Sequence, residues 1–191
     1  MKARREAWPA AVAGVPPEKL AFLDETGANT MMDRSYGYAP RGERLEASVP
    51  NGHRKSLTFV AALTAGGMVA PLALDGPMTG EVFLAYVGQI LLPELRPGTA
   101  VVMDNLPCHK VKGVREAVEA AGCRLEYLPP YSPDLNPIEN AFSKFKGLLR
   151  KAAARTVDGV YDAMRDAVTR FGSTECLNYF RHAGYGPATP N

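Results

Sequence analysis

Two aspartates follow short apolar runs that are typical of buried strands. Asp24 lies at the end of KLAFLDE (19–25), and Asp104 lies at the end of TAVVMDN (99–105). Chemistry in open α/β sheets collects at the carboxyl ends of strands, so Asp24 and Asp104 converge if their strands are parallel neighbours. An aspartate that only ends a strand or caps the next helix would give the same pattern, and for either residue alone this alternative stays open.

A third acid, Glu139, comes at the end of the proline-rich stretch YLPPYSPDLNPIEN (127–140). Asn136, Pro137 and Glu139 fit the N-cap, first and third positions of a helix. A capping box, in which the Glu139 side chain returns to the backbone N–H of Asn136, would explain these residues without catalysis. It would not explain the preceding prolines, which hold the loop in one path. Rigid placement of one carboxylate is what a metal site requires.

The helix that begins near Glu139 carries a basic track. Ser143, Lys146 and Arg150 share a face with Glu139 at helical spacing. An acid followed by a basic track suits a substrate with a phosphate backbone, although a solvated basic face is the competing interpretation. The candidate DNA-binding residues in this track and in two other basic clusters are His53, Arg54, Lys55, Lys110, Lys144, Lys146, Arg150 and Lys151.

Composition indicates one soluble globular domain. The chain has 191 residues, 46% of them hydrophobic and 22% charged, and its net charge of +2 does not by itself indicate a nucleic-acid partner. The cysteines Cys108, Cys123 and Cys176 are widely spaced, which favours free thiols in a reducing cytoplasm. Cys108 adjoins His109, but other ligands of a tetrahedral zinc site are missing from the sequence, so we expect a free thiol there. No signal peptide or membrane span is predicted.

The pattern of apolar residues predicts a mixed sheet with helices packed on it, an α/β fold. We expect strands at 19–25, 99–105 and 123–128, and a hairpin of SLTFVAAL and MVAPLAL around 65–67. We expect helices at about 79–92 (stopped by Pro93), 109–121, from 137 onward, 157–171 and 174–181. Residues 1–17 are predicted to be a linker or the remnant of an upstream region, residues 18–185 one domain, and 186–191 a tail. Residues 26–55 are turn-rich, with short strands possible.

Three segments together resemble a known family. LDET, VVMDN with its following H and K, and LPPYSPDLNPIEN closely resemble the catalytic domain of the Asp-Asp-Glu transposases, in particular the bacterial insertion-sequence branch of the mariner superfamily. The resemblance covers about residues 18–185, and the spacing of Asp104 and Glu139 agrees with it. It implies a ribonuclease-H-like fold, a mixed sheet flanked by helices, in which Asp24, Asp104 and Glu139 are the catalytic acids.

The resemblance also implies the chemistry. The three acids would bind two Mg²⁺ ions, with Mn²⁺ as a substitute, and would support cleavage at the ends of an insertion sequence and strand transfer into target DNA. The family usually targets TA dinucleotides, and holding two ends together implies a homodimer during the reaction. The expected location is the bacterial cytoplasm.

Four further residues are candidates for supporting roles around the acids. Asn105 and Asn140 each follow or adjoin one of the acids, and Asn136 could shape the turn. His109 could contact DNA or cap a helix. Glu25 adjoins Asp24, but strand alternation directs its side chain to the other face of the sheet.

One departure from the family matters. Full-length relatives carry an N-terminal helix-turn-helix region that reads the terminal repeats, whereas here the first motif is preceded only by residues 1–17. We therefore expect a catalytic half, produced by a split reading frame or a truncated element. An alternative is a catalytically silent, truncated transposase that acts as a DNA-binding or dimerising regulator. A cellular ribonuclease-H-like nuclease ranks well below the active transposase, because YSPDLNPIEN belongs so closely to transposases.

Overall fold

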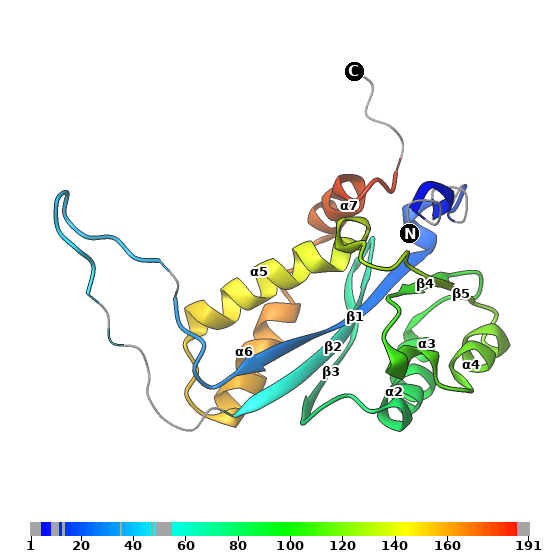
Figure 1. Ribbon diagram of the computed structural model, residues 1–191, viewed down its shortest axis with the longest axis horizontal. Coiled ribbons are helices and arrows are strands. Elements are labelled where there is room, and N and C mark those ends of the chain that lie inside the picture. The colour runs from blue at the N-terminus through cyan, green and yellow to red at the C-terminus, as the bar shows by residue number, and fades with distance from the viewer. Residues whose placement is uncertain are drawn as a thin grey trace, which may run out of the picture.

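A five-stranded mixed sheet forms the centre of the computed structural model, which describes residues 5–8, 12, 14–34, 36–46, 48 and 55–186. The strands lie in the order β3-β2-β1-β4-β5 (Figure 1). Their bounds are β1 Leu20–Asn29, β2 Ser56–Thr64, β3 Gly67–Asp75, β4 Ala100–Met103 and β5 Arg124–Tyr127. Sequence analysis predicted this α/β arrangement.

Strand direction changes at β1. Strands β1, β2 and β3 are antiparallel neighbours, whereas β1–β4 and β4–β5 are parallel. In the β1–β4 register Leu23 pairs with Met103, so the residues that follow, Asp24 and Asp104, leave the paired segment at the same edge. The condition for the two aspartates to converge is therefore met.

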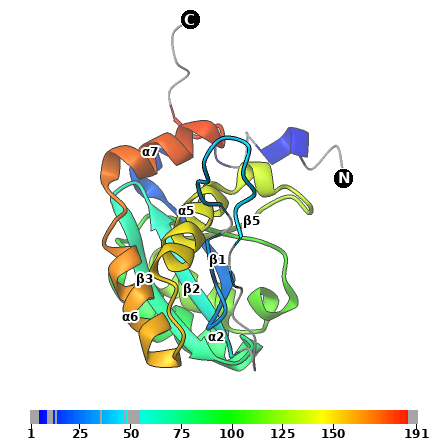
Figure 2. The same cartoon turned by 90° about the vertical axis from the view of Figure 1, so that its left-hand side faces the viewer.

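Helices cover both faces of the sheet (Figures 1 and 2). On one face lie α5 (Pro137–Ala152), α6 (Val157–Val168) and α7 (Ser173–His182), and on the other lie α2 (Gly80–Tyr86), α3 (Leu92–Glu94) and α4 (Val114–Ala120). A cluster that includes Phe22, Phe59 and Phe145 fills the α5 side. A second cluster that includes Leu23, Phe83 and Val101 fills the α2 side. Alternate residues of β1 thus enter different cores, as the period of a strand requires.

Three predicted boundaries differ from the structure. Strand β1 continues to Asn29, because its second half still pairs with β2 down to Ser56, and Ala28 is buried there. The predicted helix 109–121 is instead a 3-10 turn, η3 (Pro107–Lys110), followed by α4, because Gly113 has a left-handed φ of 100°. The predicted helix 79–92 is α2, then a π-helical turn η2 (Val87–Leu91), then α3, whose first turn accommodates Pro93.

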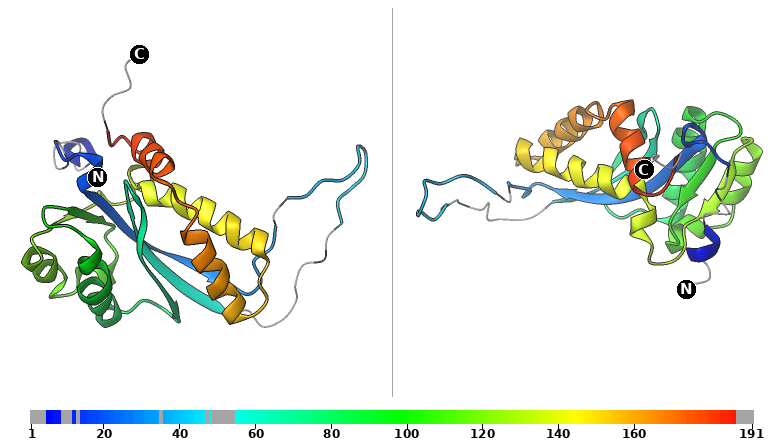
Figure 3. Two further views of the ribbon diagram at one scale, coloured as in Figure 1. Left: turned by 180° about the vertical axis from the view of Figure 1, so that it is seen from behind. Right: turned by 90° about the horizontal axis from the view of Figure 1, so that it is seen from above.

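The described part of residues 1–17 packs against the domain. Residues 5–8 are helical, and Trp8 is buried at 5% exposure in the core on the α5 side. Trp8 Nε1 donates a hydrogen bond to the Tyr185 hydroxyl at 2.8 Å, so the two ends of the domain meet. Viewed from behind and from above, the N-terminal helical turn and α7 flank the same end of the sheet (Figure 3).

Within the described ranges, no helix is both long and apolar enough to cross a bilayer.

Candidate active site

The three predicted acids line one cavity. Asp24 comes from the middle of β1, Asp104 follows the end of β4, and Glu139 lies in the first turn of α5. All three border a cavity of about 410 Å³, whose wall is completed by the proline loop 128–133. We call this cavity the acid pocket. The short strand β4 ends beside the middle of β1, and α5 also contacts β1, so the three elements meet at the cavity.

Asp24 is the buried member of the set, with 8% of its surface exposed. Its Oδ1 accepts the backbone N–H of Glu25 at 2.8 Å, and its Oδ2 accepts Nδ2 of Asn136 at 2.8 Å. Burial raises the pKa of Asp24 to about 7, and repulsion from Asp104 and Glu139 adds to the rise. Its hydrogen-bond donors are neutral, so the negative charge of this carboxylate is not compensated by them.

Asp104 lies beside a buried histidine. Nδ1 of His109 is 2.7 Å from Oδ1 of Asp104, a close ion-pair contact whose angle is too bent for a good hydrogen bond. The same Oδ1 accepts the backbone N–H of Leu106 at 2.9 Å. Although burial acts to raise the pKa of Asp104, its contact with His109 and the Leu106 N–H lower the pKa below its usual range. Asp104 is therefore held in its ionised form.

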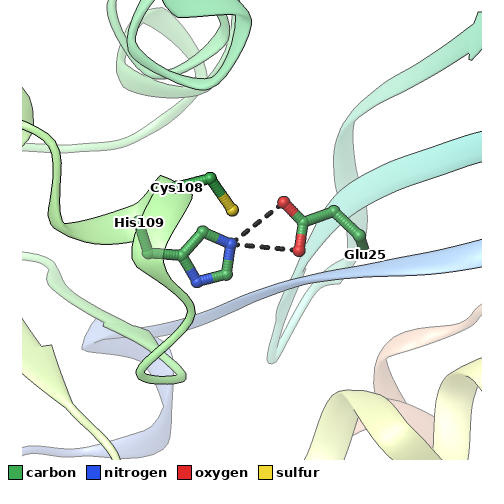
Figure 4. Close-up of side chains that lie close together, drawn as sticks. All are labelled: Glu25, Cys108 and His109. Carbon is green, nitrogen blue, oxygen red and sulfur yellow. Dashed lines mark hydrogen bonds and ion pairs between the residues drawn. The ribbon is translucent and has the colours of Figure 1, made fainter. Parts of the chain in front are cut away.

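The other ring nitrogen of His109 faces Glu25. Nε2 lies 2.9 and 3.0 Å from the two carboxylate oxygens of Glu25 (Figure 4). Burial acts to lower the pKa of His109, but the contacts with Asp104 and Glu25 outweigh it and raise the pKa to about 9. A fully buried imidazolium thus joins two carboxylates. We call Glu25, His109 and Asp104 the histidine bridge.

The position of His109 does not agree with the expectation that it contacts DNA or caps a helix. Its ring is completely buried and packs against Phe83 with ring centroids 4.4 Å apart, so it cannot contact DNA directly. Nor does it begin a helix, because it lies inside η3. Strand alternation correctly placed Glu25 on the other face from Asp24, yet the pairing of Glu25 with His109 had no signal in the sequence, since it depends on where η3 folds back onto β1.

The start of α5 is not a capping box. The backbone N–H of Asn136 donates to the carbonyl of Pro133 at 3.0 Å, so it is not available to the Glu139 side chain. The Asn136 side chain makes no cap and is directed at Asp24 instead. Glu139 is exposed at the pocket wall. The alternative that explained Asn136 and Glu139 by capping alone is therefore wrong.

The proline loop is anchored by residues from both ends of the domain. Arg5 Nη1 donates to Ser132 Oγ at 2.8 Å, and its guanidinium pairs with Asp134. The Tyr185 hydroxyl donates to the carbonyl of Leu135 at 2.6 Å. These contacts hold the segment that leads into α5, and hence the position of Glu139. Sequence analysis did not identify the residues that make them.

The two remaining asparagine candidates differ in what they contact. Asn105 Nδ2 donates to the carbonyl of Leu128, and Asn105 Oδ1 accepts Nζ of Lys110 at 2.7 Å. Asn105 therefore ties the exit of β4 to the start of the proline loop. Asn140 lies half-buried in the first turn of α5 next to Glu139.

The basic candidates also fall into different environments. Lys144 is not a free surface cation: it pairs with Glu175 and donates to the carbonyl of Arg170, which fastens α5 to the α7 region. Lys146 and Arg150 are half-buried on α5, and Lys151 is exposed. Lys55 is exposed at the start of β2, and His53 and Arg54 lie outside the described residues.

The donor set of the acid pocket fits hard divalent cations. Carboxylate oxygens are the ligands that Mg²⁺ and Mn²⁺ prefer, and Asp24 has uncompensated charge. Oδ1 of Asn136, buried beside Asp24, has no hydrogen-bond partner among the described residues. Within these residues the three acids do not bring one oxygen each within 4.8 Å of the others, so they line the pocket without closing on one point.

A family model identifies the class. The model described as DDE superfamily endonuclease matches residues 19–160 of the chain. The chain belongs to this family. A search of curated proteins finds no match.

Solved structures of Mos1 transposase share the fold. The mariner Mos1 paired-end complex with Mg matches with a TM-score of 0.74 and 16% identity over 95% of this chain and 59% of that one. The Mos1 strand transfer complex matches with a TM-score of 0.72 and 17% identity over 96% and 57%. The Mos1 catalytic domain with Raltegravir and Mg matches with a TM-score of 0.67 and 14% identity over 95% and 85%.

These likenesses confirm the predicted ribonuclease-H-like fold, which the Mos1 catalytic domains share. The chain spans less than two thirds of the Mos1 chains in the paired-end and strand transfer complexes, and most of the chain that represents the catalytic domain alone.

Proposed function

We propose that this chain is the catalytic domain of a DNA transposase that performs metal-dependent strand cleavage and strand transfer. The observation that carries the proposal is the acid pocket, in which Asp24, Asp104 and Glu139 meet from three separate elements of a DDE superfamily endonuclease. Asp24, the most buried of the three, accepts only neutral donors in the described structure, so no cation of the fold neutralises its charge.

The residues of the pocket have distinct tasks in this proposal. Asp24, Asp104 and Glu139 hold divalent cations through their carboxylate oxygens. When bound, such ions activate the attacking oxygen, a water or a 3′-hydroxyl, and stabilise the leaving oxygen of an in-line displacement. Asn136 fixes the orientation of Asp24. His109 holds Asp104 ionised and therefore ready to accept a cation.

Several finer features belong to the same proposal and are supported by the resemblance of the sequence motifs. They are the bacterial insertion-sequence origin, a cytoplasmic location, two Mg²⁺ ions with Mn²⁺ as a substitute, a homodimer during synapsis, and a TA target. The solved Mos1 complexes with Mg and with Mn, and the paired-end complexes, are consistent with a divalent cation and with two ends held together.

A substitution at Glu139 tests the activity. We expect the wild-type chain to bind Mn²⁺ and to nick supercoiled plasmid DNA in its presence, and we expect Glu139→Gln to reduce nicking to background, because the pocket loses an anionic ligand. Electron paramagnetic resonance of free Mn²⁺ measures binding, and gel electrophoresis measures nicking. Glu94→Gln, at an exposed acid outside the pocket, is the matched control.

The outcomes separate the proposal from its main alternative. Nicking that persists in Glu139→Gln at the wild-type rate would sink the assignment of the active site. DNA binding by the wild type without Mn²⁺ binding or nicking would favour the silent regulator instead.

Two lysines of α5 test which surface meets DNA. Lys151 is exposed, so we expect Lys151→Gln to weaken binding to duplex DNA and to lower the dependence of log K on log salt by about one. Lys144 is already paired with Glu175, so Lys144→Gln should affect the salt dependence less and the stability of the fold more. Fluorescence anisotropy of labelled DNA at several salt concentrations makes the measurement. Equal changes in salt dependence for the two variants would contradict this assignment.

A further inference from the structure

Three potential metal ligands gather on the side of β1 opposite to Asp24. They are a carboxylate oxygen of Glu25, Sγ of Cys108 and a ring nitrogen of His109, and the three atoms all lie within 4.8 Å of one another. Figure 4 shows the Glu25 carboxylate and the Cys108 sulfur on the same side of the His109 ring. Sequence analysis left Cys108 as a free thiol because further ligands were missing. The sheet supplies one of them from β1.

We propose that Glu25, Cys108 and His109 form a second cation site, separate from the acid pocket and selective for a thiophilic divalent ion such as Zn²⁺. We call it the thiolate site.

The chemistry of the ligands sets this selectivity. Thiolate and imidazole are ligands that Zn²⁺ prefers, whereas Mg²⁺ requires an octahedral set of oxygens. Three protein ligands leave a fourth tetrahedral position open for water, as at zinc sites that exchange a ligand. The acid pocket offers only oxygens from its three acids, so the two sites prefer different ions.

The ligand atoms must open slightly to admit an ion. Both oxygens of Glu25 lie at 2.9 and 3.0 Å from Nε2 of His109, whereas two such ligands on one tetrahedral Zn²⁺ are about 3.3 Å apart. Binding replaces the proton on Nε2 and the proton on Sγ, and both protons pass to solvent. Cys108 is the half-exposed member, whereas His109 is fully buried, so an ion would enter from the side of the thiol.

Asp104 already lies beside the other ring nitrogen of His109. A histidine that binds a metal through one nitrogen commonly donates the N–H of the other nitrogen to a carboxylate, which fixes its tautomer. Here Nδ1 lies 2.7 Å from Oδ1 of Asp104 in an ion-pair contact, and the two groups would need to reorient to complete that hydrogen bond. Because Nδ1 faces Asp104 and Nε2 faces Glu25, Nε2 is the nitrogen that an ion would bind. His109 would therefore link the thiolate site to Asp104 of the acid pocket, as the backbone N–H of Glu25 links it to Asp24.

Titration with Co²⁺ as a spectroscopic substitute for Zn²⁺ tests the proposal in the full chain. A thiolate ligand gives a near-ultraviolet sulfur-to-cobalt absorption, which an oxygen-only site does not give. We expect this band to saturate at one Co²⁺ per chain, to persist in excess Mg²⁺ and to disappear when Zn²⁺ is added. Cys108→Ser should abolish it, and Cys123→Ser, at a buried thiol elsewhere, should leave it unchanged.

A second variant tests the third ligand. We expect Glu25→Gln to lower the affinity for Co²⁺ at least about tenfold, since even residues that only orient a ligand contribute 10- to 100-fold. Circular dichroism establishes that each variant is folded. Absence of the band in the folded wild type, or a band that survives Cys108→Ser, would overturn the proposal. The result does not depend on DNA cleavage, so it stands or falls separately from the proposed function.

Discussion

Asp24 and Glu25 are consecutive residues of β1, yet their carboxylates have opposite environments. Asp24 faces the α5 side, accepts a backbone N–H and an amide, and lies near two more acids. Glu25 faces the α2 side, where both of its oxygens contact the imidazole of His109. Both side chains are largely removed from water. Burial alone therefore does not explain the difference between these two acids.

The two carboxylates differ in the source of the positive charge near them. In the histidine bridge the fold itself supplies a cation between Glu25 and Asp104. In the acid pocket the described residues leave the charge of Asp24 uncompensated, and its raised pKa is the consequence. Ionisation of such a carboxylate is unfavourable in the free protein, and a bound external cation would make it favourable.

The largest effect is expected from breaking the histidine bridge. His109→Gln leaves Asp104 and Glu25 without their shared cation, and breaking a buried ion pair costs about 3–5 kcal/mol. Urea unfolding at pH 6 measures the loss of free energy of unfolding. The control is His182→Gln, at an exposed position of α7, which should change stability by less than about 0.5 kcal/mol. Wild-type stability in His109→Gln would contradict a charged bridge.

The same bridge predicts a dependence on pH. The pKa of His109 is raised from 6.5 to about 9, so the folded protein binds the proton more tightly than the unfolded chain does. The stabilisation is fully present below pH 6.5 and is lost as the pH rises through 9. The difference between wild type and His109→Gln should shrink over this interval.

A smaller effect of opposite sign is expected from Asp24→Asn. The pKa of Asp24 is raised from 3.8 to about 7, so the folded protein binds this proton more tightly than the unfolded chain does. Ionisation of Asp24 therefore lowers the free energy of unfolding, and this loss grows as the pH rises from 3.8 to about 7. Above that pH the loss is constant. In the presence of a metal chelator, the substitution should raise the free energy of unfolding by up to about 4 kcal/mol at pH 8 and by almost nothing near pH 4. The amide of Asn136 can turn so that its unpaired oxygen accepts a hydrogen bond from the new amide.

Thermal unfolding with and without Mg²⁺ checks this prediction. Mg²⁺ should raise the Tm of the wild type and not that of Asp24→Asn. Asp75→Asn, at an exposed acid at the end of β3, is the control. A variant that is less stable than the wild type at pH 8 would show that the charge of Asp24 is compensated in the free protein.

The smallest effect is expected at Trp8, whose partner Tyr185 supports the loop that leads into α5. Trp8→Phe keeps an aromatic ring but removes the donor to Tyr185, so it should cost about 1 kcal/mol, the usual contribution of one hydrogen bond. The histidine bridge makes no contact with this ring, so the pH dependence assigned to His109 should be unchanged. Urea unfolding followed by circular dichroism tests both points. The exposed Tyr38→Phe serves as the control, and a changed pH dependence would mean that the two regions are coupled.

The parts of the site that follow local rules could be predicted from the sequence. Apolar runs ending in acids indicated β1 and β4, alternation placed Glu25 opposite Asp24, and the proline loop indicated the start of α5. The rest depends on how distant segments pack. The pairing of His109 with Glu25 requires the turn η3 to lie against β1, and the contact of Trp8 with Tyr185 joins opposite ends of the domain. Neither depends on a residue pattern within one element, so periodicity and propensity carry no signal for them.

The hydrogen bonds from Trp8 to Tyr185 and from Tyr185 to Leu135 can form only late in the synthesis of the chain. A ribosome synthesises Tyr185 only after α5, α6 and α7. A growing chain can therefore already contain all three acids while the loop before Glu139 lacks one of its supports. We expect the loop before Glu139 to reach its final position only after Tyr185 has been made and has paired with Trp8 and Leu135.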